Sequence, residues 1–343
     1  MNSTRSIPDP LLCAFAESGA KARLEHIVED IAQYHPLLAK GETVLAQQIQ
    51  HDVIAQISNP IYGVAGYYSD NDSTQHVVVA TIDGSLYEIH WDQHTSPTSP
   101  QRLGQFSEIA SLGGFFTSDD GFQHVIVATH NGNLQELYFK DPGHVQSNIP
   151  NPLLHLNTAL GPGVGMAAFF SSDDGVHHAT VGGVDNILHE AVWGQHVTPS
   201  AHNLATQFTM SDVAAIAGYF DLSVHSRDVI VAMEGGNIYD VHYSGAILGG
   251  GPITTTLVTT FSPVLVNVAA FVSTDTHYRH VVVLNASGQV CDYSYTPGQV
   301  SGQTLIDTRS NVIDMAAYFS TYDRMCHVIL ATDNGEVHEI YYH

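Results

Sequence analysis

Short apolar stretches alternate with polar ones along most of this 343-residue chain. Residues 76–91, HVVVATIDGSLYEIHW, show the arrangement most clearly. An apolar run is followed by a polar turn at Asp83 and Gly84, and then by a run that includes both apolar and polar residues. β-Branched and aromatic residues on both sides of an Asp-Gly pair are typical of two antiparallel strands joined by a tight turn. The stretch therefore predicts a β-hairpin.

The hairpin pattern is repeated along the chain, with further copies that start at residues 124, 178, 228, 280 and 327. Each unit predicts a small-residue strand, the hairpin and a polar outer strand. Repeats of about 50 residues with four strands each are typical of β-propeller blades. We therefore predict an all-β fold, a six-bladed β-propeller of four-stranded antiparallel blades over residues 41–343. Every copy has an acid twelve positions after its start and an aromatic residue at fifteen: Glu88 and Trp91, Glu136 and Phe139, Glu190 and Trp193, Asp240 and Tyr243, Asp292 and Tyr295, Glu339 and Tyr342.

The N-terminal part is expected to complete the ring. The sixth unit stops at His343, after its third strand, whereas residues 42–49 resemble the polar outer strands at 101–106 and 203–208. We therefore expect segment 41–50 to be the outer strand of the last blade, which removes two open sheet edges. Residues 1–40 lie outside the repeat, and the spacing of Leu24, Ile27 and Ile31 predicts a short N-terminal helical extension. This extension could cap the propeller, cover its channel or support a homo-oligomer.

Composition narrows the functional classes. The 34 acidic residues against 10 basic ones give a net charge of −24, which argues against nucleic-acid and membrane-surface binding. The 22 histidines make charge and association dependent on pH. Three cysteines suggest no disulfide framework, and no signal-peptide or membrane-spanning run is evident. We expect a soluble protein that is cytoplasmic or released without a Sec signal peptide.

The first residue of each hairpin copy is histidine in five of the six units, and the turn decides whether it meets the acid. A three-residue loop with Gly84 in the left-handed conformation places Val78 opposite Glu88. His76 then lies diagonally from Glu88 on the same face of the sheet, within side-chain reach. A two-residue loop would place the two on opposite faces. A buried His–acid contact that braces each blade and a ligand-binding pair are both compatible with this pattern.

The spacing of a polar residue, an acid at twelve and an aromatic residue at fifteen resembles the six-bladed fucose-binding lectins of fungi and bacteria. Their blades read roughly Arg-Val-Tyr, a Gly/Asn turn, then Leu/Ile-x-Glu-x-x-Trp. The resemblance implies sugar sites between adjacent blades, where charged groups bind hydroxyls and rings stack on the sugar. This chain has histidine in place of the arginine, with fewer donors, which argues against fucose specificity and leaves a general polyol-binding crevice. The resemblance implies these ligand-binding residues: His76, Glu88 and Trp91; His124, Glu136 and Phe139; His178, Glu190 and Trp193; His327, Glu339 and Tyr342.

Three functions remain open. The first is a multivalent carbohydrate-binding protein, because polar pairs spread over several blades favour binding through avidity. The second is an enzyme with one site at the channel mouth, a lyase, cyclase or hydrolase using acid–base chemistry or a histidine-held metal. Its best location is the unit that departs most from the pattern, with Arg227, Asp228, Glu234 and Asp240. The third is a protein-binding scaffold.

No cofactor and no metal site is predicted. The acidic loops at 69–72, 118–121 and 171–175 lack the full set of oxygen ligands that calcium requires, and turn chemistry accounts for their composition. Nucleophile-elbow and phosphate-loop motifs are absent from the sequence, so no catalytic residue is assigned.

Overall fold

The computed structural model divides the chain into two units, Met1–Gln48 and Ile49–His343. The described residues are 49–343 without 93, 141–144, 148–152, 161–164, 195–196, 206–207, 245–251, 262–263 and 297–298. The helical extension predicted for residues 1–40 lies outside them, and so does most of segment 41–50. Among the described residues, no helix is long and apolar enough to cross a membrane.

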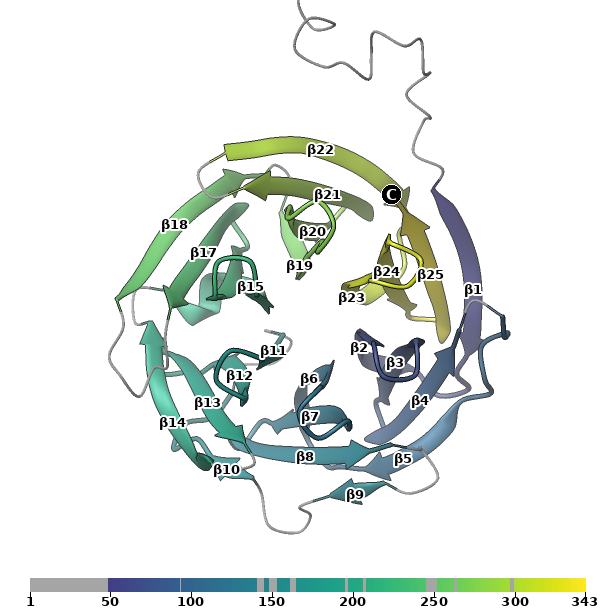
Figure 1. The fold of residues 1–343 in the computed structure, drawn as a ribbon, viewed down its shortest axis with the longest axis horizontal. Helices are drawn as coiled ribbons and strands as arrows, with labels where there is room; N and C mark the ends of the chain where they lie inside the picture. Colours follow the sequence, from purple (N-terminus) through teal and green to yellow (C-terminus); the bar gives the residue numbers. More distant parts are fainter. Residues whose placement is uncertain are drawn as a thin grey trace, which may run out of the picture. The chain divides into compact units, whose positions relative to one another are not determined.

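The described residues form six antiparallel sheets arranged in a ring (Figure 1). This confirms the predicted all-β, six-bladed propeller. Five blades have four strands, and in blade 2 the short strands β9 and β10 both pair with β8. Blade 1 consists of β2 (Ile61–Ser69), β3 (Thr74–Thr81), β4 (Ser85–Trp91) and β5 (Gln101–Gln105). Blade 2 consists of β6 (Ile109–Phe116), β7 (Gln123–Thr129), β8 (Asn133–Phe139), β9 (Gln146–Ser147) and β10 (Leu154–His155).

The remaining four blades follow in chain order around the ring. Blade 3 consists of β11 (Ala167–Ser171), β12 (Val176–Gly182), β13 (Leu188–Gly194) and β14 (Val197–Ala205). Blade 4 follows a short 3₁₀ helix, η3 (Met210–Asp212), and consists of β15 (Val213–Asp221), β16 (Ser226–Met233), β17 (Asn237–Ser244) and β18 (Ile253–Thr260). Blade 5 consists of β19 (Leu265–Val272), β20 (Arg279–Asn285), β21 (Gln289–Thr296) and β22 (Gln299–Thr308). Blade 6 consists of β23 (Val312–Ser320), β24 (Met325–Thr332), β25 (Glu336–Tyr342) and β1 (Gln50–Gln56).

The outer strand of blade 6 is therefore β1, which pairs antiparallel with β25. The described outer strand lies later in the sequence than the predicted segment 41–50 and shares only Gln50 with it, and residues 41–48 of that segment lie outside the described residues. The first four residues of β1 are exposed, and Val53 keeps 61% of its surface accessible. An outer strand with little buried surface has no apolar alternation to mark its position, and its register is set by the partner strand.

The core consists of apolar layers between neighbouring blades. The second strand of each blade is buried on both faces, and Val77, Val78 and Val79 are fully inaccessible to solvent. Each cluster combines side chains of two blades, as where Trp91 of blade 1 packs with Tyr318 of blade 6. A single blade cannot bury both of its faces, so the ring forms as one body.

Small residues on the innermost strands allow the blades to approach the common axis. A Cβ atom added at Gly113 would lie 2.5 Å from the Cβ atom of Ala168, and one at Gly114 would lie 2.7 Å from the ring of Tyr67. Both distances are too short for carbon atoms in contact. The small residues predicted for the first strand of each unit are thus required by close packing at these positions.

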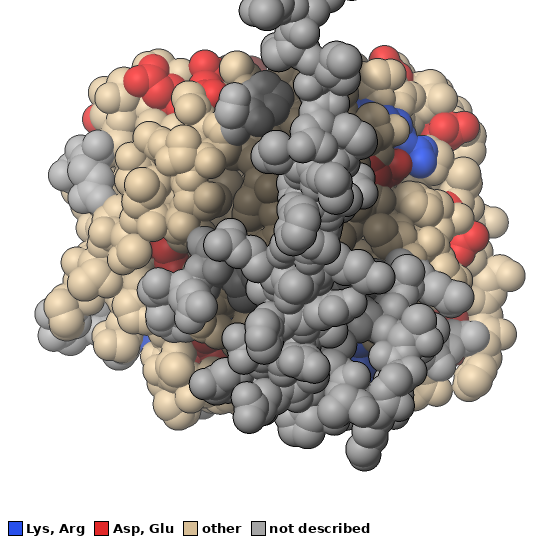
Figure 2. Space-filling view, turned by 90° about the horizontal axis from the view of Figure 1, so that it is seen from above, with Lys and Arg blue, Asp and Glu red and all other residues tan. Residues whose placement is uncertain are grey.

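Acidic residues dominate the charged surface of the face shown in Figure 2. Asp and Glu side chains are visible at several places on this face, whereas Lys and Arg side chains are few. The picture agrees with the net charge of −24.

Candidate functional site

The hairpin of blade 1 brings the first histidine and its acid together. Gly84 has a φ of 82°, Val78 pairs with Glu88, and His76 pairs with His90. The diagonal contact follows, with Nδ1 of His76 lying 2.9 Å from Oε1 of Glu88. The predicted register is therefore confirmed. The same contact recurs in four more blades: His124–Glu136 at 2.9 Å, His178–Glu190 at 2.9 Å, His280–Asp292 at 2.8 Å and His327–Glu339 at 2.8 Å.

The five histidines lie deep between the strands. Each ring stacks on an aromatic residue of the first strand of its blade, as where the rings of Tyr67 and His76 lie 5.2 Å apart and nearly parallel. In blades 1, 2 and 6 the outer nitrogen, Nε2, faces a second carboxylate in the loop before the strand. These contacts measure 3.9 Å for His76–Asp72, 3.4 Å for His124–Asp120 and 3.2 Å for His327–Asp323.

The two carboxylates set the charge of these histidines. Burial alone would lower the pKa of His76, His124 and His327, but the acids on both sides outweigh burial and raise it. Burial likewise opposes ionisation of Glu136, yet the hydrogen bonds from His124 and Trp193, together with the nearby imidazole of His177, lower the pKa of Glu136 to about 2. The two flanking carboxylates therefore favour the protonated, imidazolium form of each of these three histidines.

Stability is expected to decrease as the pH rises from about 6 to about 9. A histidine whose folded-state pKa is raised above 6.5 stabilises the fold fully below 6.5, and this contribution is lost as the pH passes the raised value. Urea unfolding at the two pH values measures the difference in the free energy of unfolding. Equal or greater stability at the higher pH would contradict the ionic character of the three histidines.

The aromatic residue at position fifteen does not meet the acid of its own blade. Glu88 and Trp91 are three residues apart on β4, so their side chains point to opposite faces. The acid instead faces the aromatic residue of the following blade: Trp193 Nε1–H donates to Glu136 over 2.9 Å, and the Tyr243 hydroxyl donates to Glu190. The predicted grouping of histidine, acid and aromatic residue within one blade is therefore wrong, because strand alternation separates them.

The contact between an acid and the aromatic residue of the following blade lies between two consecutive blades. We call each such space a crevice and number it by the two blades that form it, so that the 2/3 crevice lies between blades 2 and 3. The residue just before the first position of a hairpin copy also enters the crevice shared with the preceding blade, and this arrangement is seen in five of the six crevices. In the 1/2 crevice the amide of Gln123 donates to Ser69 over 3.1 Å, and in the 6/1 crevice the Tyr318 hydroxyl donates to Gln75 over 2.8 Å. Our sequence interpretation missed this position, although strand alternation indicates that it faces away from its neighbour, the first histidine.

Arginine occupies this position in blades 4 and 5. Arg227 is fully buried in the 3/4 crevice, where it donates to Asp173 and Asp174 over 2.6 Å. In the 4/5 crevice Arg279 contacts Asp228 at 2.9 Å and Asp240 at 3.2 Å. Guanidinium groups thus fill both crevices.

The unit that departs most from the repeat forms a buried charge cluster. Asp228 and Asp240 lie within the 4/5 crevice and are buried, whereas Glu234 is exposed. Burial and the nearby Asp228 carboxylate raise the pKa of Asp240 to about 7. Arg279 neutralises much of this cluster, so these acids already have a structural partner.

The 6/1 crevice is open to a cavity of about 520 Å³. His327 and Glu339 of blade 6 line this cavity, and Trp91 of blade 1 lines it as well. Gln75, Asp323 and Tyr341 add further polar and aromatic side chains to the lining. This crevice therefore combines a His–acid pair, further polar groups and two rings around free space.

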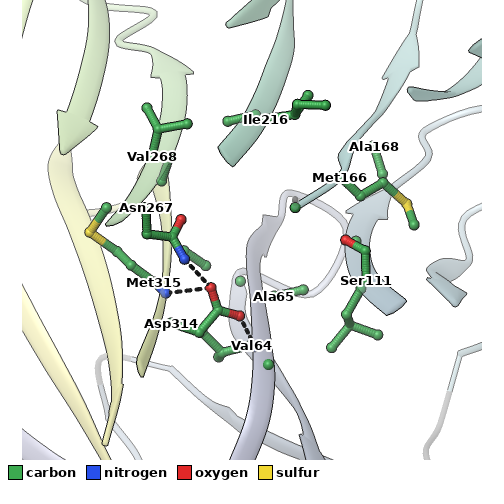
Figure 3. A pocket seen from close by; sticks show the side chains of 18 of the residues that line it. Val64, Ala65, Ser111, Met166, Ala168, Ile216, Asn267, Val268, Asp314 and Met315 are labelled. Carbon is green, nitrogen blue, oxygen red and sulfur yellow. Dashed lines mark hydrogen bonds between the residues drawn. The ribbon is translucent and has the colours of Figure 1, made fainter. Parts of the chain in front are cut away.

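A second cavity of about 300 Å³ lies among the small residues of the innermost strands (Figure 3). Its carboxylate, Asp314, accepts hydrogen bonds from the amides of Val64 at 2.6 Å and Met315 at 2.9 Å, and from the side chain of Asn267. Burial raises the pKa of Asp314 to about 6 despite these bonds. Both oxygens are thus engaged by groups from three blades, which makes Asp314 a link between blades 1, 5 and 6.

Neither a protein-family model nor a curated protein matches the chain. Solved structures do. AofleA from Arthrobotrys oligospora is 13% identical with a TM-score of 0.63, covering 87% of this chain and 86% of that chain. The fucose-specific lectin from Aleuria aurantia is 12% identical with a TM-score of 0.63, covering 84% and 93%. The lectin BP39L from Burkholderia pseudomallei is 16% identical with a TM-score of 0.59, covering 81% and 80%. Fungal and bacterial lectins, which the repeat resembles, therefore share this fold.

Proposed function

We propose that the protein binds carbohydrate, and that the 6/1 crevice is its main sugar site. The observation that carries the proposal is the lining of one open cavity by His327, Glu339 and Trp91. The fold shared with a fucose-specific lectin supports the same class of ligand.

The chemistry of the crevice suits a sugar. A carboxylate accepts hydrogen bonds from neighbouring hydroxyls, and bonds to a charged acceptor are stronger than those between neutral groups. The side-chain amide of Gln75 adds N–H donors, since its oxygen already accepts from Tyr318. The rings of Trp91 and Tyr341 offer apolar surface for the C–H face of a pyranose. A volume of about 520 Å³ lies within the usual range of ligand pockets, about 300–1,000 Å³.

The six crevices are not equivalent in this proposal. Guanidinium groups of Arg227 and Arg279 occupy the 3/4 and 4/5 crevices and are held there by carboxylates. The 1/2 crevice repeats the polar set of the 6/1 crevice with His76, Glu88 and Gln123, and it is the second candidate site. Multivalent binding thus rests on fewer sites than blades.

Sugar specificity is proposed to differ from that of a fucose-binding lectin. In the 6/1 crevice the group at the first position is His327, held by acids at both nitrogens with distances of 2.8 Å and 3.2 Å. An imidazolium in this setting presents fewer free donors to a ligand than a guanidinium does. The proposed ligand class is therefore a polyol sugar bound mainly through acceptor groups.

A glycan-array screen of the purified full chain, followed by calorimetry with the best glycan, tests the proposal. Glu339→Gln is expected to weaken binding about 10–100-fold, because a hydrogen bond to a charged acceptor contributes about 1.5–3 kcal/mol. Glutamine preserves the shape and can still accept the bond from His327. The matched control is Glu190→Gln in the arginine-filled 3/4 crevice, which is expected to leave affinity unchanged.

Two results would contradict the proposal. One is an array without binding at neutral pH and at about pH 5.5, where more histidines are protonated. The other is equal loss of affinity in Glu339→Gln and Glu190→Gln, which would indicate a shared structural effect. Binding of fucosides alone would retain the sugar site and overturn the proposed specificity.

A further inference from the structure

The 2/3 crevice contains a group of potential metal ligands. Asp120 lies in the loop before β7, His124 lies on β7 in blade 2, and His177 lies on β12 in blade 3. One ligand atom from each of the three lies within 4.8 Å of the others. The two imidazole rings are 4.6 Å apart between centroids, with their planes at 65°.

The orientation of His124 is typical of a metal-binding histidine. Its Nδ1 lies 2.9 Å from Oε1 of Glu136, which leaves Nε2 directed toward Asp120. Glu136 itself accepts a bond from Trp193 Nε1–H over 2.9 Å, so the carboxylate is held in place. Metal-binding histidines almost always donate their second nitrogen to a carboxylate or carbonyl group in this way, which sets the tautomer and the ring orientation.

His177 is a buried histidine whose ring nitrogens are left without hydrogen bonds by the described residues. Only 4% of its surface is exposed, and neither ring nitrogen has a hydrogen-bond partner among the described residues. The carboxylate of Glu136 is 3.8 Å from Nδ1, beyond hydrogen-bond distance. At the equivalent position the side chains of Gln75 and Gln123 do have partners. A buried polar group without a partner is costly, and a bound ligand would satisfy it.

We propose that Asp120, His124 and His177 bind a divalent transition-metal ion, with Zn²⁺ as the best fit. Zinc accepts imidazole and carboxylate ligands at about 2.0–2.1 Å, so two ligands of a tetrahedral site lie about 3.3 Å apart. The distance between Asp120 Oδ2 and His124 Nε2 is 3.4 Å. Three protein ligands leave a fourth position for water or an exogenous ligand. Asp120 is partly exposed, which gives the ion a path into the crevice.

The proposed ion would connect two blades and is independent of the proposed sugar site in the 6/1 crevice. It departs from our expectation, from sequence alone, of no metal site. That expectation considered each acidic loop by itself, whereas these ligands come from two consecutive blades.

The test is a titration of metal-free full-length protein with Zn²⁺, and with Co²⁺ to read the coordination from its visible spectrum. Wild-type protein is expected to show a site that both His177→Gln and Asp120→Asn weaken by more than about 100-fold. His177→Gln reproduces the donor set of the 1/2 crevice, with Asp72, His76 and Gln123, so the fold tolerates it. The reciprocal variant Gln123→His is expected to add a second site.

The stoichiometry decides the outcome. One additional bound ion in Gln123→His and one fewer in His177→Gln would support the proposal. Zinc should also raise the melting temperature of the wild-type protein but not that of His177→Gln. Zinc binding of equal affinity and stoichiometry in wild type and His177→Gln would place the ion on other residues and overturn the proposal. Absence of zinc binding to the wild-type protein would overturn it as well.

Discussion

Replacing Arg279 with methionine is expected to destabilise the propeller by about 3–5 kcal/mol at about pH 8. Three buried carboxylates depend on this guanidinium: Asp221 at 3.2 Å, Asp228 at 2.9 Å and Asp240 at 3.2 Å. None of the three exposes more than 5% of its surface. Removing the cation leaves negative charges together in a medium that cannot solvate them, which costs far more than the loss of a surface ion pair.

The pH dependence should identify this cause. Burial and Asp228 raise the pKa of Asp240 to about 7, above its ordinary value of 3.8. At pH values between these two, the folded state therefore holds a proton that the unfolded state has released. Stability from this group is therefore present at low pH and is lost as the pH rises through about 7. The loss of unfolding free energy caused by Arg279→Met is accordingly expected to be smaller at about pH 5 than at about pH 8.

The measurement is urea unfolding of wild type and variant at both pH values. Arg324→Met is the matched control, because Arg324 pairs with Asp275 at 3.2 Å but keeps 69% of its side chain exposed. Arg324→Met is expected to lower the free energy of unfolding by no more than about 1 kcal/mol. Similar destabilisation in both variants would show that the buried cluster does not depend on Arg279.

Breaking one buried His–acid pair is expected to destabilise the fold by about 3–5 kcal/mol, whereas replacing both partners should restore much of the loss. The pair of His280 and Asp292 suits this test, because both are buried and lie outside the proposed sites. The imidazole is stacked on Phe271 with 4.7 Å between ring centroids. A phenyl ring at position 280 keeps this stacking, so His280→Phe mainly removes the partner of the carboxylate.

A double-mutant cycle with His280→Phe and Asp292→Val measures the coupling. Valine has a similar size to aspartate and suits a strand. A double variant more stable than His280→Phe would assign this pair a bracing role within the blade. Strictly additive losses would indicate that the two side chains do not stabilise one another. The same cycle at His327 and Glu339 should additionally abolish sugar binding, which separates bracing from ligand contact.

The sequence by itself determined the features that depend on local geometry. The two-residue alternation along each strand and the left-handed glycine at position 84 were sufficient to predict that Val78 lies opposite Glu88 and that His76 reaches Glu88 diagonally. The repeat then predicted six blades, because every unit leaves apolar faces that only its neighbours can cover. Short-range turn chemistry and strand periodicity carry both inferences.

The contacts between blades were decided only by the tertiary structure. Trp193 bonds to Glu136 of the preceding blade, and Arg279 bonds to Asp228 of the preceding blade, because the ring brings opposite faces of consecutive sheets together. The outer strand β1 likewise takes its place from pairing with β25, since its own exposed residues carry little pattern. Whether a crevice is open or filled depends on contacts between residues far apart in the sequence, 51 positions for Arg279 and Asp228 and 243 positions for Tyr318 and Gln75. Local sequence periodicity contains no information about such contacts.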